Sequence, residues 1–158
     1  MTTIGVTGHM GLTAATRVAV SAELAGRLAD VPGPLVGYTS LAPGADQIFA
    51  WSVLAAGGSV VFVPPCEEIE STIPEANLRQ FRAAQSAASE IIPPAHVLPS
   101  EQAFFDAGRY IAEHVDLLVA VWDGGPSGGL GGTADIVEIR ESSGRPWLRV
   151  WPAAASRG

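Results

Sequence analysis

Residues 116–138 read DLLVAVWDGGPSGGLGGTADIVE and join a short apolar run to a helical pattern. The run 117–121 is uninterrupted, as in a strand buried on both faces, and six glycines lie between Asp123 and Thr133. Glycines let backbone N–H groups approach a ligand, and a helix N-terminus adds positive potential. This stretch therefore predicts an α/β protein that binds a small anion, and the anion we expect first is the phosphate of a nucleotide.

Strand-like runs and helical patterns also alternate along the rest of the chain. Short apolar runs typical of buried strands recur at 4–7, 35–38, 59–63 and 147–151. Helical spacing of apolar residues predicts helices at 13–29, 45–56, 102–113 and 133–142. Because alternating strands and helices form right-handed βαβ units, we expect a Rossmann-like, doubly wound, mostly parallel sheet with helices on both faces.

The domain organisation follows from length and composition. With 158 residues, 47% of them hydrophobic, the chain predicts a single domain over residues 1–152, and we expect a frayed tail at 153–158. Residues 64–99 fit the alternation less well, because they open with two prolines and three glutamates before a helical stretch at 75–90. We interpret 64–99 as an insertion or cap beside the strand ends, with a short further strand at 96–98.

Charge and cysteine content exclude several functional classes. The net charge is −7, and all nine basic residues are arginines, so a Walker-type lysine and Schiff-base chemistry are excluded. The acidic balance argues against a nucleic-acid partner, because such binding needs cationic surface. The single cysteine forms no internal disulfide, the sequence does not begin as a signal peptide, and no apolar run is long enough for a membrane span. We therefore expect a cytoplasmic protein with neither nucleic-acid nor membrane partners.

A second glycine turn, GVTGHMG at residues 5–11, follows the first strand. Ligands bind open α/β sheets at this edge, so Gly8 and His9 are candidate contacts; the alternative is an ordinary tight turn with a capping histidine. The spacing G-x-x-G-x-x-G differs from the dinucleotide fingerprint, and no acid ends the second strand, which argues against a conventional NAD dehydrogenase. The other two histidines lack an acid or cysteine at metal-ligand spacing, and we expect neither a metal nor a cofactor.

A third turn follows the second strand as APGAD, residues 42–46. Gly44 forms the turn, and the carboxylate of Asp46 lies in the first turn of the helix, where it stabilises the helix dipole. This stabilising role explains Asp46 by itself. Because the turn lies at the same sheet edge as the other glycine turns, Gly44 and Asp46 are also candidate ligand contacts.

Within the glycine-rich loop, the phosphate-binding candidates are Gly129, Gly131, Gly132 and Thr133. Their backbone donors and the threonine hydroxyl suit a phosphate; the alternative is a surface loop with a threonine N-cap. The GPSGG segment matches a nucleophile elbow only formally, because the helix does not follow the serine at once, and a serine hydrolase is excluded. Asp123, at the strand end, is placed to bind ribose hydroxyls or a cationic sugar, or else forms an Asp-Gly turn.

Three motifs, GVTGHM, SLAPGAD and VAVWDGGPSGGLGGTAD, together resemble the SLOG superfamily. That group joins the DprA DNA-processing proteins, the LOG-type lysine-decarboxylase-like proteins and the YspA/YpsA-like proteins, and the resemblance spans residues 4–150. It implies a Rossmann-like, often dimeric protein that binds a nucleotide-type small molecule. It therefore implies a homodimer or higher homo-oligomer. For the LOG branch it implies hydrolysis of the N-glycosidic bond of nucleoside 5′-monophosphates.

The chain departs from the LOG pattern P-G-G-x-G-T-x-x-E, because Ile136 stands where that pattern has its glutamate. The candidate catalytic acids are therefore Asp135 and Asp123, and the resemblance implies an arginine of the middle segment, for which Arg79 and Arg82 are the candidates. Two functions follow: a LOG-like phosphoribohydrolase, or a non-catalytic sensor of a nucleotide or ADP-ribose-type ligand, which the missing glutamate favours. An interaction module with a vestigial pocket is a third reading.

Overall fold

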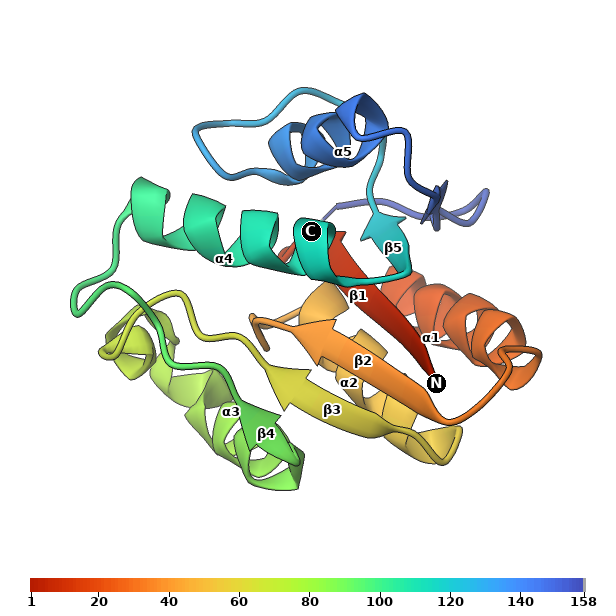
Figure 1. Ribbon diagram of the computed structural model, residues 1–158, viewed down its shortest axis with the longest axis horizontal. Helices are drawn as coiled ribbons and strands as arrows, with labels where there is room; N and C mark the ends of the chain where they lie inside the picture. Colours follow the sequence, from red (N-terminus) through yellow and green to blue (C-terminus); the bar gives the residue numbers. More distant parts are fainter. Residues whose placement is uncertain (158) are drawn as a thin grey trace.

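The computed structural model describes residues 1–157, in which a parallel sheet carries helices on both faces (Figure 1). The strands are β1 (Thr2–Gly8), β2 (Leu35–Thr39), β3 (Ser59–Phe62), β4 (Glu90–Ile91), β5 (Leu117–Val121) and β6 (Trp147–Arg149). The helices are α1 (Ala14–Ala29), α2 (Ala45–Ala55), the 3-10 helix η1 (Ile69–Thr72), α3 (Glu75–Ala87), α4 (Glu101–His114) and α5 (Thr133–Ser142). Within residues 1–157, no helix has both the length and the apolar character needed to cross a membrane.

The sheet order is β4-β3-β2-β1-β5-β6, and every neighbouring pair is parallel. The chain adds strands on one side of β1 as far as β4 and then crosses to β5 on the other side. In the register of this central pair, Gly8 lies opposite Val121, so β1 and β5 end together. This confirms the doubly wound, Rossmann-like fold and places the crevice where such sheets bind ligands beyond β1 and β5.

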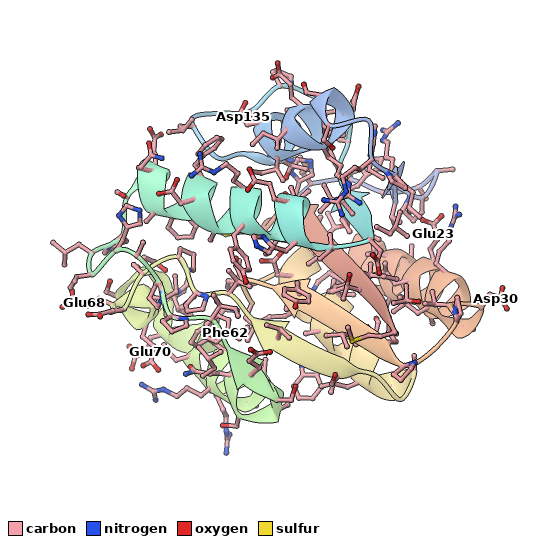
Figure 2. All side chains as sticks on the ribbon, viewed as in Figure 1. Glu23, Asp30, Phe62, Glu68, Glu70 and Asp135 are labelled. Carbon is pink, nitrogen blue, oxygen red and sulfur yellow. The ribbon has the colours of Figure 1, made fainter. Side chains whose placement is uncertain are left out.

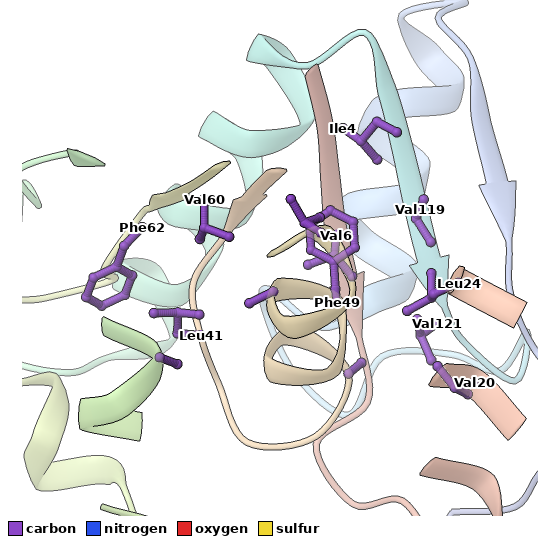
Figure 3. Packing of buried hydrophobic residues seen from close by; sticks show 14 of the residues in the cluster. Ile4, Val6, Val20, Leu24, Leu41, Phe49, Val60, Phe62, Val119 and Val121 are labelled. Atoms are coloured by element: carbon purple, nitrogen blue, oxygen red, sulfur yellow. The ribbon is translucent and has the colours of Figure 1, made fainter. Parts of the chain in front are cut away.

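Both faces of the sheet are buried. Helices α1, α2 and α3 cover one face, and α4 and α5 cover the other (Figure 1). Side chains alternate accordingly along β3: Val60 and Phe62 join the cluster beneath α2, whereas Val61 points toward α4. Figure 3 shows the first cluster, in which Phe49 of α2 lies beside Val6 of β1. This two-sided burial explains why the strands are continuous apolar runs.

A buried arginine holds the elements together at the amino-terminal edge of the sheet. The side chain of Arg140, on α5, is completely buried. Its guanidinium donates at 2.6–2.9 Å to four carbonyl oxygens, those of Ala112, Val115, Asp116 and Pro146. Because these carbonyls belong to the end of α4 and to the segments that enter β5 and β6, one side chain fixes three elements.

Residues 64–99 contribute both a helix and an edge strand. The predicted helix 75–90 ends earlier, at Ala87, because Glu90–Ile91 forms β4 alongside β3. The prediction of a strand at 96–98 is wrong. Three prolines between residues 93 and 99 offer no N–H groups to a ladder, and the carbonyls of His96 and Val97 instead accept the N–H groups of the loop after β3.

The segment 153–157, expected as a frayed tail, lies against the start of α1. Ser156 N–H donates to the hydroxyl of Thr16 at 2.8 Å, and that hydroxyl lies 3.1 Å from the Ser156 carbonyl oxygen. Arg157 pairs with Leu12 in an isolated antiparallel bridge. The tail therefore carries Arg157 to the carboxyl edge of the sheet.

Candidate functional site

Two adjoining cavities open at the carboxyl edge of the sheet. The larger, of about 860 Å³, is named here the apolar cavity; its walls include Ile69, Ile73, Phe104 and Leu130. The smaller, of about 450 Å³, is named the polar cavity; its walls include His9, Asp46, Ser127, Thr133 and Arg157. The glycine-rich loop forms a wall of both cavities through Gly128, Gly131 and Gly132. A ligand at this loop therefore has access to a polar and an apolar compartment.

The glycine-rich loop is held by its own polar groups. The N–H of Gly125 donates to Asp123 Oδ1 at 2.8 Å, and the N–H of Gly131 donates to Asp135 Oδ2 at 3.0 Å. Asp135 lies beside this loop, at one end of the molecule (Figure 2). Gly131 has φ +86°, and a Cβ there would lie 2.9 Å from the backbone nitrogen of Phe105, so only glycine fits. These bonds shape the loop without using the donors at the start of α5.

The first N–H groups of α5 are free to bind a ligand. Its N-cap is Gly132, which has no side chain to cap the helix, and the hydroxyl of Ser127 accepts the N–H of Asp135 at 3.2 Å. Within residues 1–157, neither the Thr133 nor the Ala134 N–H has an acceptor at hydrogen-bond distance, and both residues line the polar cavity. Helix N-termini with free donors are anion sites.

Helix α2 also begins at a glycine, but its first donor is used. Gly44 has φ +96°, and a Cβ there would collide with the carbonyl oxygen of Met10. The N–H of Ala45 donates to the His9 carbonyl oxygen at 3.1 Å, which ties the start of α2 to the end of β1. Gly8 permits this close approach, because a Cβ there would lie 2.6 Å from the Ala45 methyl group. The first donor of α2 is therefore occupied, whereas the first donor of α5 has no acceptor among residues 1–157.

His9 and Asp123 join the ends of β1 and β5. The Asp123 N–H donates to His9 Nε2 at 3.1 Å, and the same nitrogen lies 3.2 Å from Asp123 Oδ1. Burial lowers the pKa of His9, and the Arg157 charge lowers it further, although Asp123 opposes both effects. The bond from Gly125 N–H, together with His9 and Arg157, lowers the pKa of Asp123. The pair is therefore a neutral imidazole beside a carboxylate at neutral pH.

Asp46 is a buried carboxyl group on the wall of the polar cavity. Its side chain accepts the Ala42 N–H at 3.2 Å, through Oδ2. Burial raises the pKa of Asp46 to about 7, against the opposing effect of that hydrogen bond. At neutral pH, Asp46 therefore exchanges between its acid and carboxylate forms.

The structure brings most of the predicted contacts together. Those that line the polar cavity are Gly8, His9, Asp46, Gly131, Gly132 and Thr133, and those that line the apolar cavity include Gly44 and Gly129. The carboxylates of Asp123 and Asp135 bind loop N–H groups, and neither residue belongs to the walls of these two cavities. Arg79 is exposed on α3 and lies outside both walls. The catalytic roles of these three residues stay predictions.

Sequence reasoning missed the apolar wall and the distant arginines. Ile69 and Ile73 come from the segment before α3, and Phe104 comes from α4; in the sequence they resemble ordinary core residues. Arg17 and Arg157 reach the cavities from α1 and from the C-terminal segment, and no local motif marks them. Only the interruption of the strand–helix alternation at 64–99 signalled that this part of the chain adds to the site.

Neither a family model nor a curated protein matches the sequence. Solved structures do match the fold. DNA processing protein A (DprA) from Streptococcus pneumoniae superposes with a TM-score of 0.69 at 18% identity, over 98% of this chain and 52% of that one. DprA from Helicobacter pylori, which binds single-stranded DNA, gives 0.67 at 14% identity, over 99% and 68%. The chain shares the fold of these proteins, which belong to the SLOG superfamily. It spans about half the length of the S. pneumoniae protein.

A further SLOG-fold match is the molybdenum cofactor binding protein from Rippkaea orientalis. It superposes with a TM-score of 0.61 at 15% identity, over 94% of this chain and 75% of that one. The SLOG resemblance drawn from the three glycine motifs is therefore confirmed as a fold. The matched proteins bind different ligands although they have the same fold.

The expectation that excluded a nucleic-acid partner is wrong. The H. pylori DprA, a single-stranded-DNA-binding protein, has the same SLOG fold. The physical error lies in arguing from net charge, because a formal charge of −7 says nothing of the potential at one edge of the sheet. Free helix N–H groups and arginines such as Arg157 attract phosphate locally in an acidic protein.

Proposed function

We propose that this protein binds a nucleotide or nucleotide-derived anion, with a phosphate at the start of α5 and a flat ring in the apolar cavity. One observation carries the proposal: the unpartnered N–H groups of Thr133 and Ala134 lie on the wall of the polar cavity, beside glycines that border both cavities. Unpaired backbone donors at a helix start are costly unless water or a ligand satisfies them.

The polar cavity suits a phosphate. Two backbone donors and the Thr133 hydroxyl converge there, and Arg157 lines the same cavity. The helix dipole of α5 adds positive potential at the same point, since its N-terminus faces the cavity. An anion in this position replaces water as the acceptor for Thr133 and Ala134.

The apolar cavity suits the ring. Its volume of about 860 Å³ lies in the range of ligand sites, and the side chains of Ile69, Ile73 and Phe104 offer apolar faces for stacking. Proteins of the same fold bind single-stranded DNA and the molybdenum cofactor, two ligands that both combine phosphate with a heterocycle. This shared chemistry supports a ligand that fills both cavities.

Hydrolysis of the N-glycosidic bond of a nucleoside 5′-monophosphate is the second candidate function. The observation that favours it is Asp46, a buried carboxyl group of the polar cavity whose pKa of about 7 suits proton transfer at neutral pH. The acids predicted for this role, Asp123 and Asp135, already accept loop N–H groups. Release of free base separates this candidate from simple binding.

The test is a thermal-shift screen against AMP, NAD, ADP-ribose and a thymidine oligonucleotide, followed by chromatography of each ligand. A ligand at about 100 times its dissociation constant adds roughly 2.7 kcal/mol, which raises the melting midpoint by about 5–10 °C. Intact ligand identifies a binding protein, and free base identifies a hydrolase. No shift with any of the four contradicts the proposal.

A matched pair of proline variants locates the phosphate. Thr133→Pro removes a donor and a hydroxyl at the first position of α5, where the preceding Gly132 is already extended at ψ 169°. Ala14→Pro removes the corresponding backbone donor at the first position of α1, after the equally extended Thr13 at ψ 158°. Thr133→Pro is expected to weaken binding at least tenfold, and Ala14→Pro to leave it unchanged, with both proteins folded. Equal affinities would place the phosphate elsewhere.

A further inference from the structure

Asp46 differs from the other carboxylates at the site in its burial, because Asp123 and Asp135 are only half-buried. Its Oδ2 accepts the Ala42 N–H, whereas no hydrogen bond to Oδ1 exists among residues 1–157. Within the same range, no arginine or histidine forms an ion pair with it. Yet the residue is only 8% exposed, and it lines the polar cavity. The carboxyl group therefore has a single hydrogen-bond donor within this range, which leaves Oδ1 available to a ligand in the cavity.

Its position relative to the free donors of α5 suggests what that partner is. Thr133 and Ala134 line the same cavity as Asp46, so an anion held by their N–H groups shares that space with its carboxyl group. A carboxylate near a phosphate repels it, whereas a neutral carboxyl group donates an O–H hydrogen bond to it. The neutral form of Asp46 is therefore the form compatible with an anion in the polar cavity.

We propose that Asp46 contacts the ligand in its protonated form, so that binding of an anion takes up one proton. The inference rests on the proposed function, because it requires an anion at the start of α5. No covalent step is involved: the proton comes from solvent and stays on the carboxyl group. The raised pKa of Asp46, about 7, makes the protonated form accessible near neutral pH.

Other charged groups lie around the cavity on several elements. His9, at the end of β1, has a lowered pKa and is already neutral above pH 7, and Asp123, at the end of β5, has a lowered pKa and is ionised. Asp135 of α5 accepts the Gly131 N–H, and Arg157 of the C-terminal segment lies 3.8 Å from Asp123 Oδ2. In the adjoining apolar cavity, the charged side chains are Arg17 of α1 and Glu101 of α4. Asp46 is the group among these whose pKa is raised to about 7.

The experiment measures binding of NAD, ADP-ribose and a thymidine oligonucleotide by calorimetry from about pH 6 to pH 9. The phosphates of these three probes do not titrate in that range, unlike the phosphate of AMP. Wild-type affinity is expected to fall about tenfold per pH unit above pH 7, with uptake of close to one proton at pH 8. The uptake is obtained from heats in two buffers of different ionisation enthalpy, and this measurement needs no variant.

Asp46→Asn is the decisive variant. Its amide oxygen still accepts the Ala42 N–H, while its neutral side chain imitates the protonated acid. We expect a flat pH profile and, at about pH 8.5, tighter binding than in the wild type by a factor above ten. Asp30→Asn, at the exposed end of α1 and far from the site (Figure 2), is the matched control and keeps the wild-type profile.

The outcomes separate the two proposals. Binding without proton uptake, or the same pH profile in wild type and Asp46→Asn, overturns the role of Asp46 and leaves the binding proposal standing. Absence of binding for all three probes at pH 6, where Asp46 is protonated, overturns the proposed function and the role of Asp46 with it. A purely structural Asp46 predicts unchanged pH dependence in the asparagine variant.

Discussion

The backbone polar groups at the two edges of the sheet differ in whether they have hydrogen-bond partners within the protein. At the amino-terminal edge, Arg140 satisfies four carbonyl oxygens, and the Asp116 carboxylate accepts the Thr3 N–H at 2.9 Å. At the carboxyl edge, the N–H groups of Thr133 and Ala134 have no partner among residues 1–157. Folding alone explains the first edge, because buried polar groups are normally paired. The second edge is where we propose that a ligand binds.

The helix starts repeat this contrast within the carboxyl edge itself. Helices α1 and α4 begin with capping side chains, since Thr13 accepts the Thr16 N–H and Ser100 accepts the Ala103 N–H. Helices α2 and α5 begin instead at Gly44 and Gly132. Capping side chains stabilise a helix but occupy its donors. At α5 the Ser127 hydroxyl accepts the Asp135 N–H in place of an N-cap side chain, and we propose that a ligand takes the Thr133 and Ala134 donors on the wall of the polar cavity.

The largest expected effect is on the paired edge, from Arg140→Leu. Four carbonyl oxygens lose their donor in a region where Arg140 is fully buried, so we expect a loss of about 3–5 kcal/mol in the free energy of unfolding. Urea denaturation measures this loss. Arg79→Leu, at an exposed position of α3, is the control and changes stability by less than about 0.5 kcal/mol. Similar stability of both variants would contradict the contrast between the edges.

The next effect concerns the carboxyl edge and depends on pH. The folded-state pKa of Asp46, about 7, lies above its ordinary value of 3.8, so the folded protein favours the protonated carboxyl group. Its contribution to stability is complete below about pH 4 and is lost as the pH rises to about 7. Asp46→Asn does not have this loss. The variant is therefore expected to gain about 2–4 kcal/mol over the wild type between pH 4 and pH 8.

Denaturation at a series of pH values measures this gain. Asp106, Asp116 and Asp123 have lowered pKa values, so their stabilisation is lost below about pH 4, outside the window of Asp46. The difference between variant and wild type removes their contribution, because it is common to both proteins. A constant difference across pH 4–8 would show that Asp46 does not titrate in that window.

The sequence predicted what depends on neighbouring residues. The predicted strand 117–121 and the predicted helix 133–142 match β5 and α5 in their bounds. A strand buried on both faces is an unbroken apolar run in the sequence, and the start of a helix is marked by residues next to it, so both can be recognised locally. Strand β4 was missed because Glu90 and Ile91 are both exposed and show no pattern. The glycine turns could be predicted because they act through their own backbone.

What the sequence could not show depends on distant residues. Phe104 resembles a core residue until α4 places it on a cavity wall, and Arg157 reaches the site only because the C-terminal segment lies along α1. Asp46 was a candidate contact, but its burial, and with it the pKa of about 7, follows from the packing of α2 against β1. The argument from net charge against nucleic-acid binding failed for the same reason, because net charge does not say where on the surface the charged residues lie.

The smallest effect tests the helix starts directly. Thr13→Ala removes the hydroxyl that accepts the Thr16 N–H at 3.2 Å, so we expect a loss of about 1 kcal/mol in stability and no change in ligand affinity. Thr133→Pro is expected to weaken ligand binding and to leave stability nearly unchanged, because the Ser127 hydroxyl that accepts the Asp135 N–H stays in place. Chemical denaturation and calorimetry of both variants give the two quantities. If Thr133→Pro costs as much stability as Thr13→Ala and leaves affinity intact, α5 begins as an ordinary helix, and its free donors are satisfied by water.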